Sequence, residues 1–429
     1  MCYYNLMAKA LKSKLYFFLA SYFRFFAAIQ LRKWSPQIIV ITGSSGKTTL
    51  LHLIESQLGE QARYSHHANS SFGIPFDVLG LKRSTLQKTE WLYLLLAAPV
   101  KAFKKPYLQK LYVVEADCDR SGEGKFLASW LKPAITVLTG ISLTHSMNFD
   151  PLVANGKFPT IEKAIAYEFG YFIEYAQDLA IVNGDDDLSK SEFSRARAKV
   201  EQIKQPIAAN FYQILPSSTE FIIDGELVSI SALLPREVFF SIAATKTLVN
   251  KLGASFDPSF KNFKLPPGRS SVFAGIKNTT LIDSSYNANL DSMQAILDMY
   301  RLYPGNNKWA VLGDMLEQGS QEQQQHEKLA ELIKVLNLKK IILMGPRVCK
   351  YTYPKLKSIL PNSGIIKFEQ PRPLLDYIVA EIRGGETILF KGARFLEGVV
   401  EHLLQNKSDA TKLCRREKIW QIRRKQWGL

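Results

Sequence analysis

Short apolar runs that end in polar or glycine-containing residues recur along the chain. Near-continuous apolar runs of this kind are typical of strands buried on both faces of a parallel sheet. Stretches of helical character follow them, so the pattern predicts an α/β fold in which ligands bind at the carboxyl ends of the strands. The predicted strands lie in "QIIVITGSS", "LYVVEADCD", "AITVLTGIS", "LAIVNGDDD", "KWAVLGDML", "KKIILMGPR" and "TILFKGARF".

The sequence "FKLPPGRSS" at 263–271 interrupts this alternation, because two prolines and a glycine end any helix or strand. We therefore expect a central α/β domain over 37–264, built on a mostly parallel sheet, and a Rossmann-like α/β domain over 265–406. A basic aromatic segment, 1–36, precedes them. A basic tail, 407–429, follows as either a helix or a disordered arm.

The composition agrees with a folded protein of this size. At 429 residues the chain fits two or three domains, and a content of 46% hydrophobic residues suffices for their cores. The four cysteines lie far apart without a C-x-x-C pair, which argues against a disulfide framework and against a cysteine zinc site. A reducing cytoplasm is the simpler interpretation.

The net charge of +16 is concentrated at the two ends of the chain, 1–36 and 407–429, each of which carries +6. Such ends suit an anionic partner surface, either a membrane or a nucleic acid, and the absence of a nucleic-acid recognition motif in the sequence disfavours the second. The longest uncharged run near the N-terminus, 15–23, is far shorter than the ~20 residues that span a bilayer. We expect this segment either to lie in a membrane interface or to pack on the protein itself. The apolar and then basic stretch at 90–107 carries the same two alternatives.

The stretch "ITGSSGKTTL" at 41–50 is a candidate phosphate-binding loop. It follows a predicted buried strand and precedes a helix whose apolar residues fall at helical spacing, at 50, 51, 54 and 58. The N-terminus of that helix offers unpaired N–H groups to an anion, and Gly43 and Gly46 let the backbone approach it. Lys47 can neutralise phosphate charge, and the Thr48 hydroxyl can reach Mg²⁺. The loop is shorter than the common G-x-x-x-x-G-K-[ST] form.

This short loop resembles that of the Mur ligases, the ATP-dependent amide-forming enzymes of peptidoglycan synthesis, and of their folylpolyglutamate synthase relatives. Two long segments, "IDSSYNANLDSMQAIL" at 282–297 and "AVLGDMLEQGSQEQQQH" at 310–326, resemble the branch that adds D-alanyl-D-alanine to the UDP-muramoyl tripeptide. "VVEADCDRSGEG" at 113–124 resembles the family's V-x-E-x-G…P-G-E stretch. Other segments that resemble family motifs, in the same order, are "NSSFGIP" (69–75), "TVLTGISLTH" (136–145), "IVNGDDD" (181–187), "PPGR" (266–269) and "LFKGARFLEGVV" (389–400).

The resemblance implies ATP and Mg²⁺ as cofactors and assigns residues to each part of the site. The catalytic residues that it implies are Lys47, Glu115 and His145, and the implied metal ligands are Thr48, Glu115 and His145. The implied nucleotide contacts are Gly43, Ser44, Ser45, Gly46, Lys47, Thr48, Thr49, Arg269, Asp283 and Asn287. The implied substrate contacts are Asn69 and Lys391.

The chain also departs from the family pattern. The 36 residues before the first predicted strand are too few for the family's UDP-sugar-binding domain, so we expect a modified acceptor. Phe169 stands where the family has a carbamylated lysine that helps to hold a second Mg²⁺, and the neighbouring Glu168 would point about 100° away on a helix. The second metal site is therefore either altered or absent. Phe240 replaces the family's nucleotide-contacting asparagine.

These observations predict an ATP-dependent ligase that activates a carboxylate as an acyl phosphate and joins it to an amine. The expected partners are a small-molecule or lipid-linked cell-wall precursor and an amino acid or dipeptide. The expected location is the cytoplasm, including the inner face of the membrane. Two alternatives stay open: another amino-acid ligase of the Mur and folylpolyglutamate type, and a nucleotide-binding scaffold without ligase activity, which Phe169 and Phe240 favour.

Overall fold

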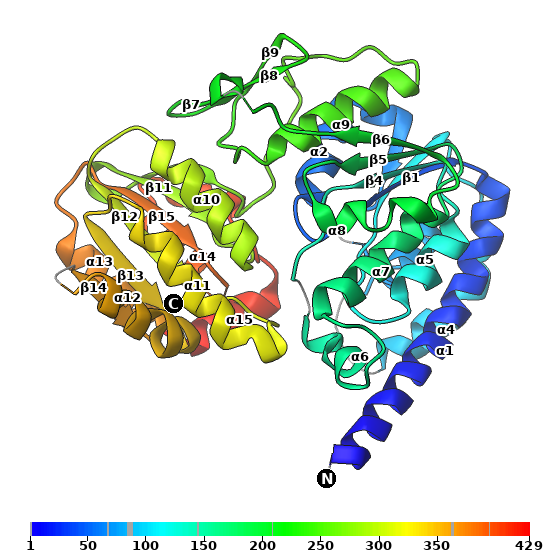
Figure 1. Cartoon of the computed structure of the whole chain (residues 1–429), viewed down its shortest axis with the longest axis horizontal. Helices are drawn as coiled ribbons and strands as arrows, with labels where there is room; N and C mark the ends of the chain where they lie inside the picture. The colour runs from blue at the N-terminus through cyan, green and yellow to red at the C-terminus, as the bar shows by residue number, and fades with distance from the viewer. Residues whose placement is uncertain are drawn as a thin grey trace. The chain divides into compact units, whose positions relative to one another are not determined.

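The computed structural model describes the backbone of residues 2–66, 68–83, 89–143, 146–207, 209–361, 364–393 and 395–429, and their side chains except for those of 2–14 and 209. The chain divides into two compact units, and Figure 1 labels their elements. Unit 1 comprises Met1–Ser142, Pro151–Lys204 and Ala244–Ala254. Unit 2 comprises Leu143–Asp150, Gln205–Ala243 and Ser255–Leu429.

Unit 1 is built on a six-stranded sheet in the order β2-β3-β1-β4-β5-β6, in which every pair of neighbours is parallel. The register pairs Ile41 with Glu115 and Thr42 with Leu138, so β1, β3 and β4 end at the same edge. Polar residues that follow these strands are therefore brought together. The strands are β1 (Gln37–Thr42), β2 (Ala62–Tyr64), β3 (Leu111–Glu115), β4 (Ile135–Leu138), β5 (Leu179–Asn183) and β6 (Lys199–Ile203).

Helices cover this sheet, and α2 buries the apolar positions 50, 51, 54 and 58 as the sequence periodicity predicts. Helix α9 (Val238–Lys251) extends from unit 2 into unit 1. The remaining helices of this part of the chain are α1 (Cys2–Trp34), α2 (Lys47–Leu58), α3 (Gly73–Leu79), α4 (Glu90–Ala102), α5 (Glu123–Leu131), α6 (Asp150–Ala154), α7 (Ile161–Glu174) and α8 (Asp187–Lys190), with 3-10 turns at Gly59–Gln61, Ser146–Asn148 and Phe193–Arg195.

Helix α1 packs on α3 and α4, and Figure 1 shows it beside α4. Its buried residues Phe23, Ala27 and Trp34 recur at the spacing of one helix face, and the Trp34 indole donates to the carbonyl of Gln109 at 2.6 Å. One face of residues 20–34 thus packs on the protein itself. Among the helices of the described residues, none combines the length and the apolar character that crossing a membrane requires.

Unit 2 is built on a six-stranded sheet in the order β10-β11-β15-β12-β13-β14, with β10 antiparallel to β11 and the other pairs parallel. Its strands are β10 (Ser271–Gly275), β11 (Thr279–Ser284), β12 (Lys308–Gly313), β13 (Lys340–Met344), β14 (Ile365–Phe368) and β15 (Thr387–Lys391). A separate antiparallel sheet contains β7 (Tyr212–Ile214), β8 (Thr219–Ile223) and β9 (Glu226–Ile230).

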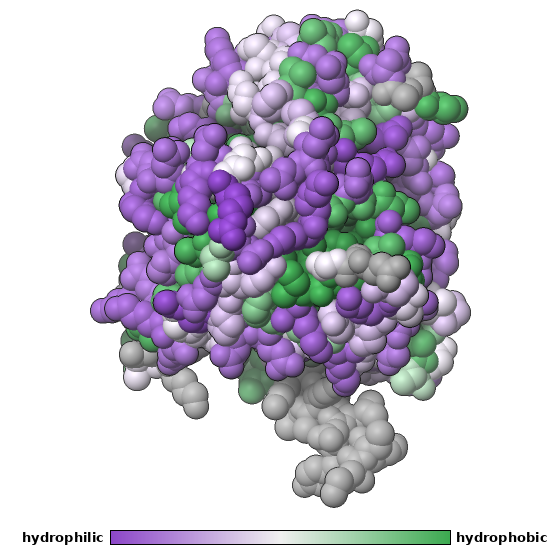
Figure 2. Space-filling model, turned by 90° about the vertical axis from the view of Figure 1, so that its left-hand side faces the viewer, coloured by the Kyte–Doolittle hydropathy of each residue, from purple (hydrophilic) through white to green (hydrophobic). Residues whose placement is uncertain are grey.

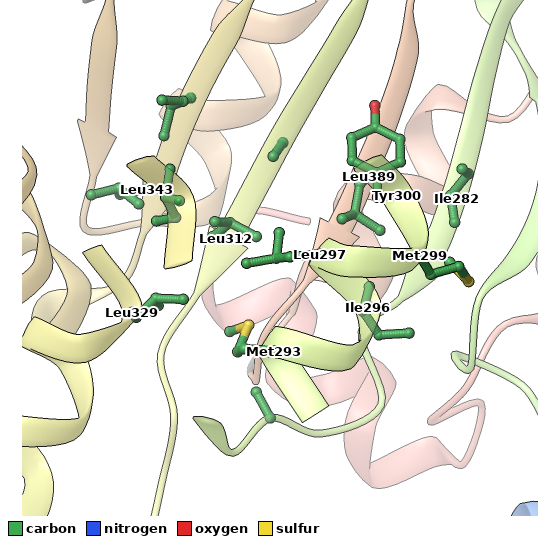
Figure 3. Close-up of a cluster of buried hydrophobic side chains, with 14 of the residues drawn as sticks. Ile282, Met293, Ile296, Leu297, Met299, Tyr300, Leu312, Leu329, Leu343 and Leu389 are labelled. Carbon is green, nitrogen blue, oxygen red and sulfur yellow. The ribbon is translucent and has the colours of Figure 1, made fainter. Parts of the chain in front are cut away.

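Both faces of the unit 2 sheet are buried, which explains why its strands read as continuous apolar runs. Leu312 and Leu389 belong to a cluster that includes Leu297 of α10, and Figure 3 shows these side chains meeting. Val311, next to Leu312, belongs to the opposite cluster with α13 and α14. Hydrophilic residues cover most of the outer face drawn in Figure 2. The helices are α10 (Leu290–Leu302), α11 (Glu322–Lys334), α12 (Tyr353–Ile359), α13 (Pro371–Glu381), α14 (Leu396–Leu403) and α15 (Lys418–Gln426).

The predicted α/β class is confirmed, and each of the seven predicted strands is present as β1, β3, β4, β5, β12, β13 or β15. Short strands such as β2, with three residues, carry too little pattern to be predicted. The basic tail takes the helical alternative: it contains a 3-10 helix, Lys407–Lys412, and α15, in which Arg424 is buried. The domain boundaries at 264 and 406 stay predictions.

Candidate nucleotide-binding site

The candidate phosphate-binding loop joins β1 to α2 at the carboxyl edge of the unit 1 sheet. Gly43 has φ 125° and Gly46 has φ 84°, backbone conformations that favour glycine. A Cβ atom on Gly43 would lie 2.3 Å from the Thr139 hydroxyl, so only glycine fits against the end of β4. Gly46 is the N-cap of α2 and offers no side-chain cap to the first turn. A helix N-terminus that begins at a left-handed glycine is a geometry that suits an anion.

Hydrogen bonds tie the loop to the residues after β4. The Ser44 N–H donates to the carbonyl of Gly140 at 2.8 Å, and the Ser44 hydroxyl exchanges hydrogen bonds with the backbone of Ser142. The Thr139 hydroxyl donates to the carbonyl of Ser45 at 2.7 Å. These contacts fix the loop conformation. The signal for them in the sequence is the polar run that follows the predicted strand.

A second set of polar residues, after β5, holds the same β4 loop. The Asn183 amide donates to the carbonyl of Thr139 at 3.1 Å, and the Ile141 N–H donates to Asp186 at 2.7 Å. The donor Asn183 and the acceptor Asp186 both come from the "IVNGDDD" segment. They support the phosphate-binding loop from one strand further away, which is a positioning role.

Lys47, the first residue of α2, is buried and points back along the loop. Its ammonium group donates to the carbonyl of Gly43 at 2.5 Å and forms an ion pair with Asp117 at 2.9 Å. Burial alone would lower the pKa of Lys47, but the nearby carboxylates of Asp117 and Glu115 raise it above its ordinary value. Lys47 therefore stays positively charged at neutral pH.

The Thr48 hydroxyl lies 3.2 Å from both carboxylate oxygens of Glu115, at the end of β3. The Glu115 N–H donates to the hydroxyl of Ser65 at 2.9 Å, which fixes the strand end. Hydroxyl and carboxylate oxygens are the ligands that Mg²⁺ prefers. The two residues that the sequence assigns to the metal thus meet in unit 1. His145, the third, lies outside the described residues.

Asp117 is a functional candidate that the sequence interpretation missed. It follows Glu115 by two positions, where the V-x-E-x-G pattern has glycine, and its N–H donates to the carbonyl of Asn69 at 2.8 Å. The sequence did contain a signal for Asp117: an acidic residue stands near the end of a predicted strand, at a position where the family pattern has glycine. Asn69 is half-buried beside it, and Thr49 is buried in the first turn of α2.

The predicted residues of unit 2 gather around the end of β15. The Lys391 ammonium donates to the carbonyl of Asn287 at 2.6 Å. Burial lowers the pKa of Lys391 to about 7, with a further contribution from Arg269, while Asp283 acts in the opposite direction. Burial raises the pKa of Asp283 to about 6, and its Oδ2 atom has no hydrogen-bond partner among the described residues. Arg269 lies over the Tyr286 ring, 4.9 Å from its centre.

Family comparisons match both units. Residues 41–214 match the Mur ligase middle domain, and residues 268–394 match the Mur ligase glutamate ligase domain. These two domains together account for most of the chain.

The chain belongs to the Mur ligase family.

Among curated relatives, the UDP-N-acetylmuramoyl-tripeptide–D-alanyl-D-alanine ligase of Escherichia coli is 25% identical over 390 residues, which are 86% of this chain and 77% of the relative. The Bacillus subtilis ligase of the same name is 22% identical, with 89% and 78% covered. Among solved structures, the MurF ligase of Thermotoga maritima in complex with ADP has a TM-score of 0.71 at 21% identity, with 89% and 82% covered. A Mycobacterium tuberculosis folylpolyglutamate synthase has a TM-score of 0.58 at 14% identity, with 89% and 95% covered.

The structure explains what replaces the carbamylated lysine of the Mur ligases. Phe169 is fully buried in the core on α7. The adjacent Glu168 is also buried, and its carboxylate accepts the N–H groups of Gly122 at 2.7 Å and Gly124 at 3.0 Å. It therefore caps the N-terminus of α5, whose own N-cap residue is glycine. Both carboxylate oxygens of Glu168 thus serve a structural role at the start of α5, and the fate of the second metal site stays a prediction.

Two further residues, Phe240 and His326, are buried within the fold. Phe240 is buried on α9, with 4% of its surface exposed. His326 is fully buried, and its two ring nitrogens lie within hydrogen-bond distance of the N–H of Met315 and the carbonyl of Glu322. His326 is thus held by backbone groups on both sides.

Proposed function

We propose that this Mur ligase family protein is an ATP- and Mg²⁺-dependent ligase that forms an amide bond on a cell-wall precursor. The observation that supports this best is the convergence of Lys47, Thr48 and Glu115 at one edge of the unit 1 sheet. A cationic side chain, a helix N-terminus and a pair of hard oxygen ligands are what a nucleotide phosphate with its metal ion requires. The structures of relatives include complexes with ADP, which agrees with the proposal.

In the proposed reaction Thr48 and Glu115 would hold Mg²⁺, which would neutralise phosphate charge. Lys47 remains protonated and turns from Asp117 towards the phosphates. The carboxylate of the acceptor attacks the γ-phosphorus, ADP leaves, and an acyl phosphate forms. The amine then attacks the acyl carbon, loses a proton and displaces inorganic phosphate. The first step brings two anionic groups, the carboxylate and the γ-phosphate, close together, so the local positive charge of Lys47 lowers its barrier.

The proposed amine is D-alanyl-D-alanine or an amino acid, because the curated relatives are named for that dipeptide. The proposed acceptor is a small-molecule or lipid-linked precursor that presents a peptide carboxylate. A second candidate acceptor is a folate-like or polyamide carboxylate, which the likeness to folylpolyglutamate synthase favours.

A phosphate-release assay on the full chain tests these proposals. It uses ATP, Mg²⁺ and a panel of amines paired with carboxylate acceptors, with detergent-solubilised lipid substrates included. Release that requires a matched pair supports a ligase and identifies both substrates. ATP binding without release for any pair supports a nucleotide-binding scaffold instead.

Two variants accompany this assay. Lys47→Ala is expected to abolish release, because it removes the phosphate-binding cation. Lys199→Ala removes an exposed lysine on β6, whose side chain is 74% exposed, and is expected to leave release unchanged. Equal activity of the two variants would overturn the assignment of Lys47.

We also propose that unit 1 contacts an anionic membrane surface through the outer sides of α1 and α4. These two helices run side by side in the same direction, because Tyr22 donates to the carbonyl of Leu95 and Lys33 to the carbonyl of Lys104. Their outward apolar side chains are each 60–75% exposed, and we call them the α1–α4 face: Phe18, Phe25, Leu92, Tyr93, Leu96, Val100 and Phe103.

The positive charge beside the α1–α4 face favours an anionic membrane as its partner. Segments 1–36 and 91–114 contain no acidic residue, and Lys33 and Lys105 are exposed beside the apolar side chains. An apolar surface with basic residues around it suits the headgroup region of an anionic bilayer, where apolar groups enter the acyl boundary and cations remain at the phosphates. A lipid-linked acceptor would be met at such a surface.

Sedimentation with phosphatidylglycerol vesicles and with phosphatidylcholine vesicles tests the membrane contact. The full chain is expected to bind the anionic vesicles, and Leu96→Ser with Val100→Ser is expected to weaken binding several-fold. Val335→Ser, which changes an apolar residue of unit 2 that is 64% exposed, serves as the matched control. No binding by the unchanged protein, or self-association through the face in ultracentrifugation, would overturn the proposal.

A further inference from the structure

Two histidines and a glutamate, none of them among the residues assigned to ATP, meet between α2 and the segment that follows β2. His52 and Glu55 are one turn apart on α2, and His66 follows β2. The Nδ1 atom of His52 lies 3.4 Å from one carboxylate oxygen of Glu55, and the Nε2 atom of His66 lies 3.0 Å from the other. The ligating atoms of all three residues lie within 4.8 Å of one another.

This spacing is close to that of a metal coordination sphere. Ligand atoms at the zinc distance of about 2.0–2.1 Å and at tetrahedral angles lie roughly 3.3 Å apart. The two measured contacts bracket that separation, so small side-chain rotations would aim all three groups at one centre. The side chains are 24–36% exposed, which leaves a path for an ion and room for water at the remaining position.

The donor set decides which ion fits. Imidazole nitrogen suits Zn²⁺, Ni²⁺, Cu²⁺ and Co²⁺, whereas Mg²⁺ prefers oxygen ligands in octahedral geometry. Two imidazoles with one carboxylate therefore discriminate against the ion that Thr48 and Glu115 suit. We propose that His52, Glu55 and His66 form a separate binding site for a borderline divalent metal ion, of which Zn²⁺ is the reference case.

The position of the cluster gives the proposed ion a structural consequence. His52 lies one turn after Thr48 on α2, and His66 directly follows Ser65, whose hydroxyl accepts the N–H of Glu115. An ion held by all three residues joins α2 to the segment after β2. It thereby restrains the two elements that carry Thr48 and position Glu115. Metal binding is expected to raise the thermal midpoint of the protein independently of any ligase activity.

Equilibrium dialysis of the metal-free full chain against Zn²⁺, with millimolar Mg²⁺ present, measures the site directly. One equivalent is expected to bind. His52→Ala and His66→Ala are each expected to weaken binding at least tenfold, because each removes one of three protein ligands. His402→Ala, which removes an exposed histidine of unit 2, is expected to bind as the unchanged protein does.

Two further readouts keep this test decisive. The His52→Ala and His66→Ala variants should show the same thermal midpoint as the unchanged protein when no metal is present, and should lose the rise that Zn²⁺ produces. Co²⁺ in the site is expected to give visible absorption bands typical of tetrahedral coordination. Absence of a bound equivalent, or full binding by a variant that lacks both His52 and His66, would overturn the proposal.

Discussion

Lys47 and Asp117 form a buried ion pair of 2.9 Å at the entrance to α2. Asp117 stands where the Mur ligase pattern V-x-E-x-G has glycine, so the family pattern places no carboxylate at this position. The pair holds the lysine that we assign to the phosphates. Under the proposed function, ATP would compete with Asp117 for Lys47, and the energy of the ion pair would oppose nucleotide binding.

Asp117→Gly is expected to tighten ATP binding several-fold, because it removes this competitor. The same change should destabilise the nucleotide-free protein, since Lys47 would lose its buried partner; breaking such pairs typically costs about 3–5 kcal/mol. Calorimetric ATP titration and urea unfolding measure the two effects. Asp117→Asn removes the charge and keeps the shape. Its ATP affinity and its stability should lie between those of the unchanged protein and those of Asp117→Gly. Weaker ATP binding in both variants would instead assign Asp117 to the bound state.

Glu168→Ala is expected to lower the free energy of unfolding by about 1–3 kcal/mol, because it leaves the N–H groups of Gly122 and Gly124 buried without an acceptor. The concentration of Mg²⁺ that gives half-maximal phosphate release should not change. A large shift in that concentration would show that Glu168 contributes to a metal site.

Phe169→Lys tests the same region from the opposite direction. The substitution restores the residue type of the family, but Phe169 is completely buried. An amine placed there without a partner should destabilise unit 1 by several kcal/mol and should not restore a metal site. Urea unfolding checks this, and Phe169→Leu, which keeps the site apolar, is the matched control. Unfolding of the lysine variant at the same urea concentration as the leucine variant would contradict the prediction.

The lowered pKa of Lys391 predicts that the stability of the protein depends on pH. Its pKa is lowered from 10.5 in the unfolded chain to about 7 in the folded protein. Between these values the unfolded chain binds more protons, so the stability contribution of Lys391 rises with pH from about 7 to 10.5. The slope is at most about 1.4 kcal/mol per pH unit. Lys391→Met should flatten the rise when unfolding is measured between pH 7 and pH 9.

Asp283 has the opposite sign and serves as an internal control. Its pKa is raised from 3.8 to about 6, so the folded protein binds more protons between these values. Its contribution to stability is full below pH 3.8 and is lost as the pH rises to about 6. Asp283→Asn should therefore change the profile below pH 6, whereas Lys391→Met should change it above pH 7. A change in the same pH range for both variants would contradict these assignments.

The C-terminal helix α15 allows a comparison of two neighbouring arginines. Arg424 is buried, donates to the carbonyl of Arg415 at 2.8 Å and lies 3.7 Å from the buried carboxylate of Glu397. Arg424→Ala is expected to cost about 2–4 kcal/mol in unfolding free energy, because Glu397 loses a compensating charge. Arg423 is exposed, so Arg423→Ala should change stability by less than about 0.5 kcal/mol. A loss of stability in Arg424→Ala as small as that in Arg423→Ala, measured by thermal unfolding, would show that Arg424 does not stabilise unit 2.

Local pattern in the sequence determined much of the fold. The apolar runs predicted the principal strands of both sheets, because burial on two faces leaves a continuous apolar run. The loop "TGSSGKTT" predicted the strand before it and the helix after it, because the glycines and the helical spacing lie within a few residues of one another. The resemblance to the Mur ligases assigned Thr48 and Glu115 to a metal site. The structure places the Thr48 hydroxyl 3.2 Å from the Glu115 carboxylate, and the metal role stays a prediction.

Tertiary structure alone decided which distant residues meet. The ion pair of Lys47 with Asp117, the cap that Glu168 provides for α5, and the cluster of His52 with His66 each join different elements. The same holds for the basic tail, whose composition left a helix and a disordered arm as alternatives and did not indicate that Arg424 is buried. A side chain's partner depends on how separate helices and strands pack against one another. Local periodicity records which face of an element is buried, but not which residue lies opposite.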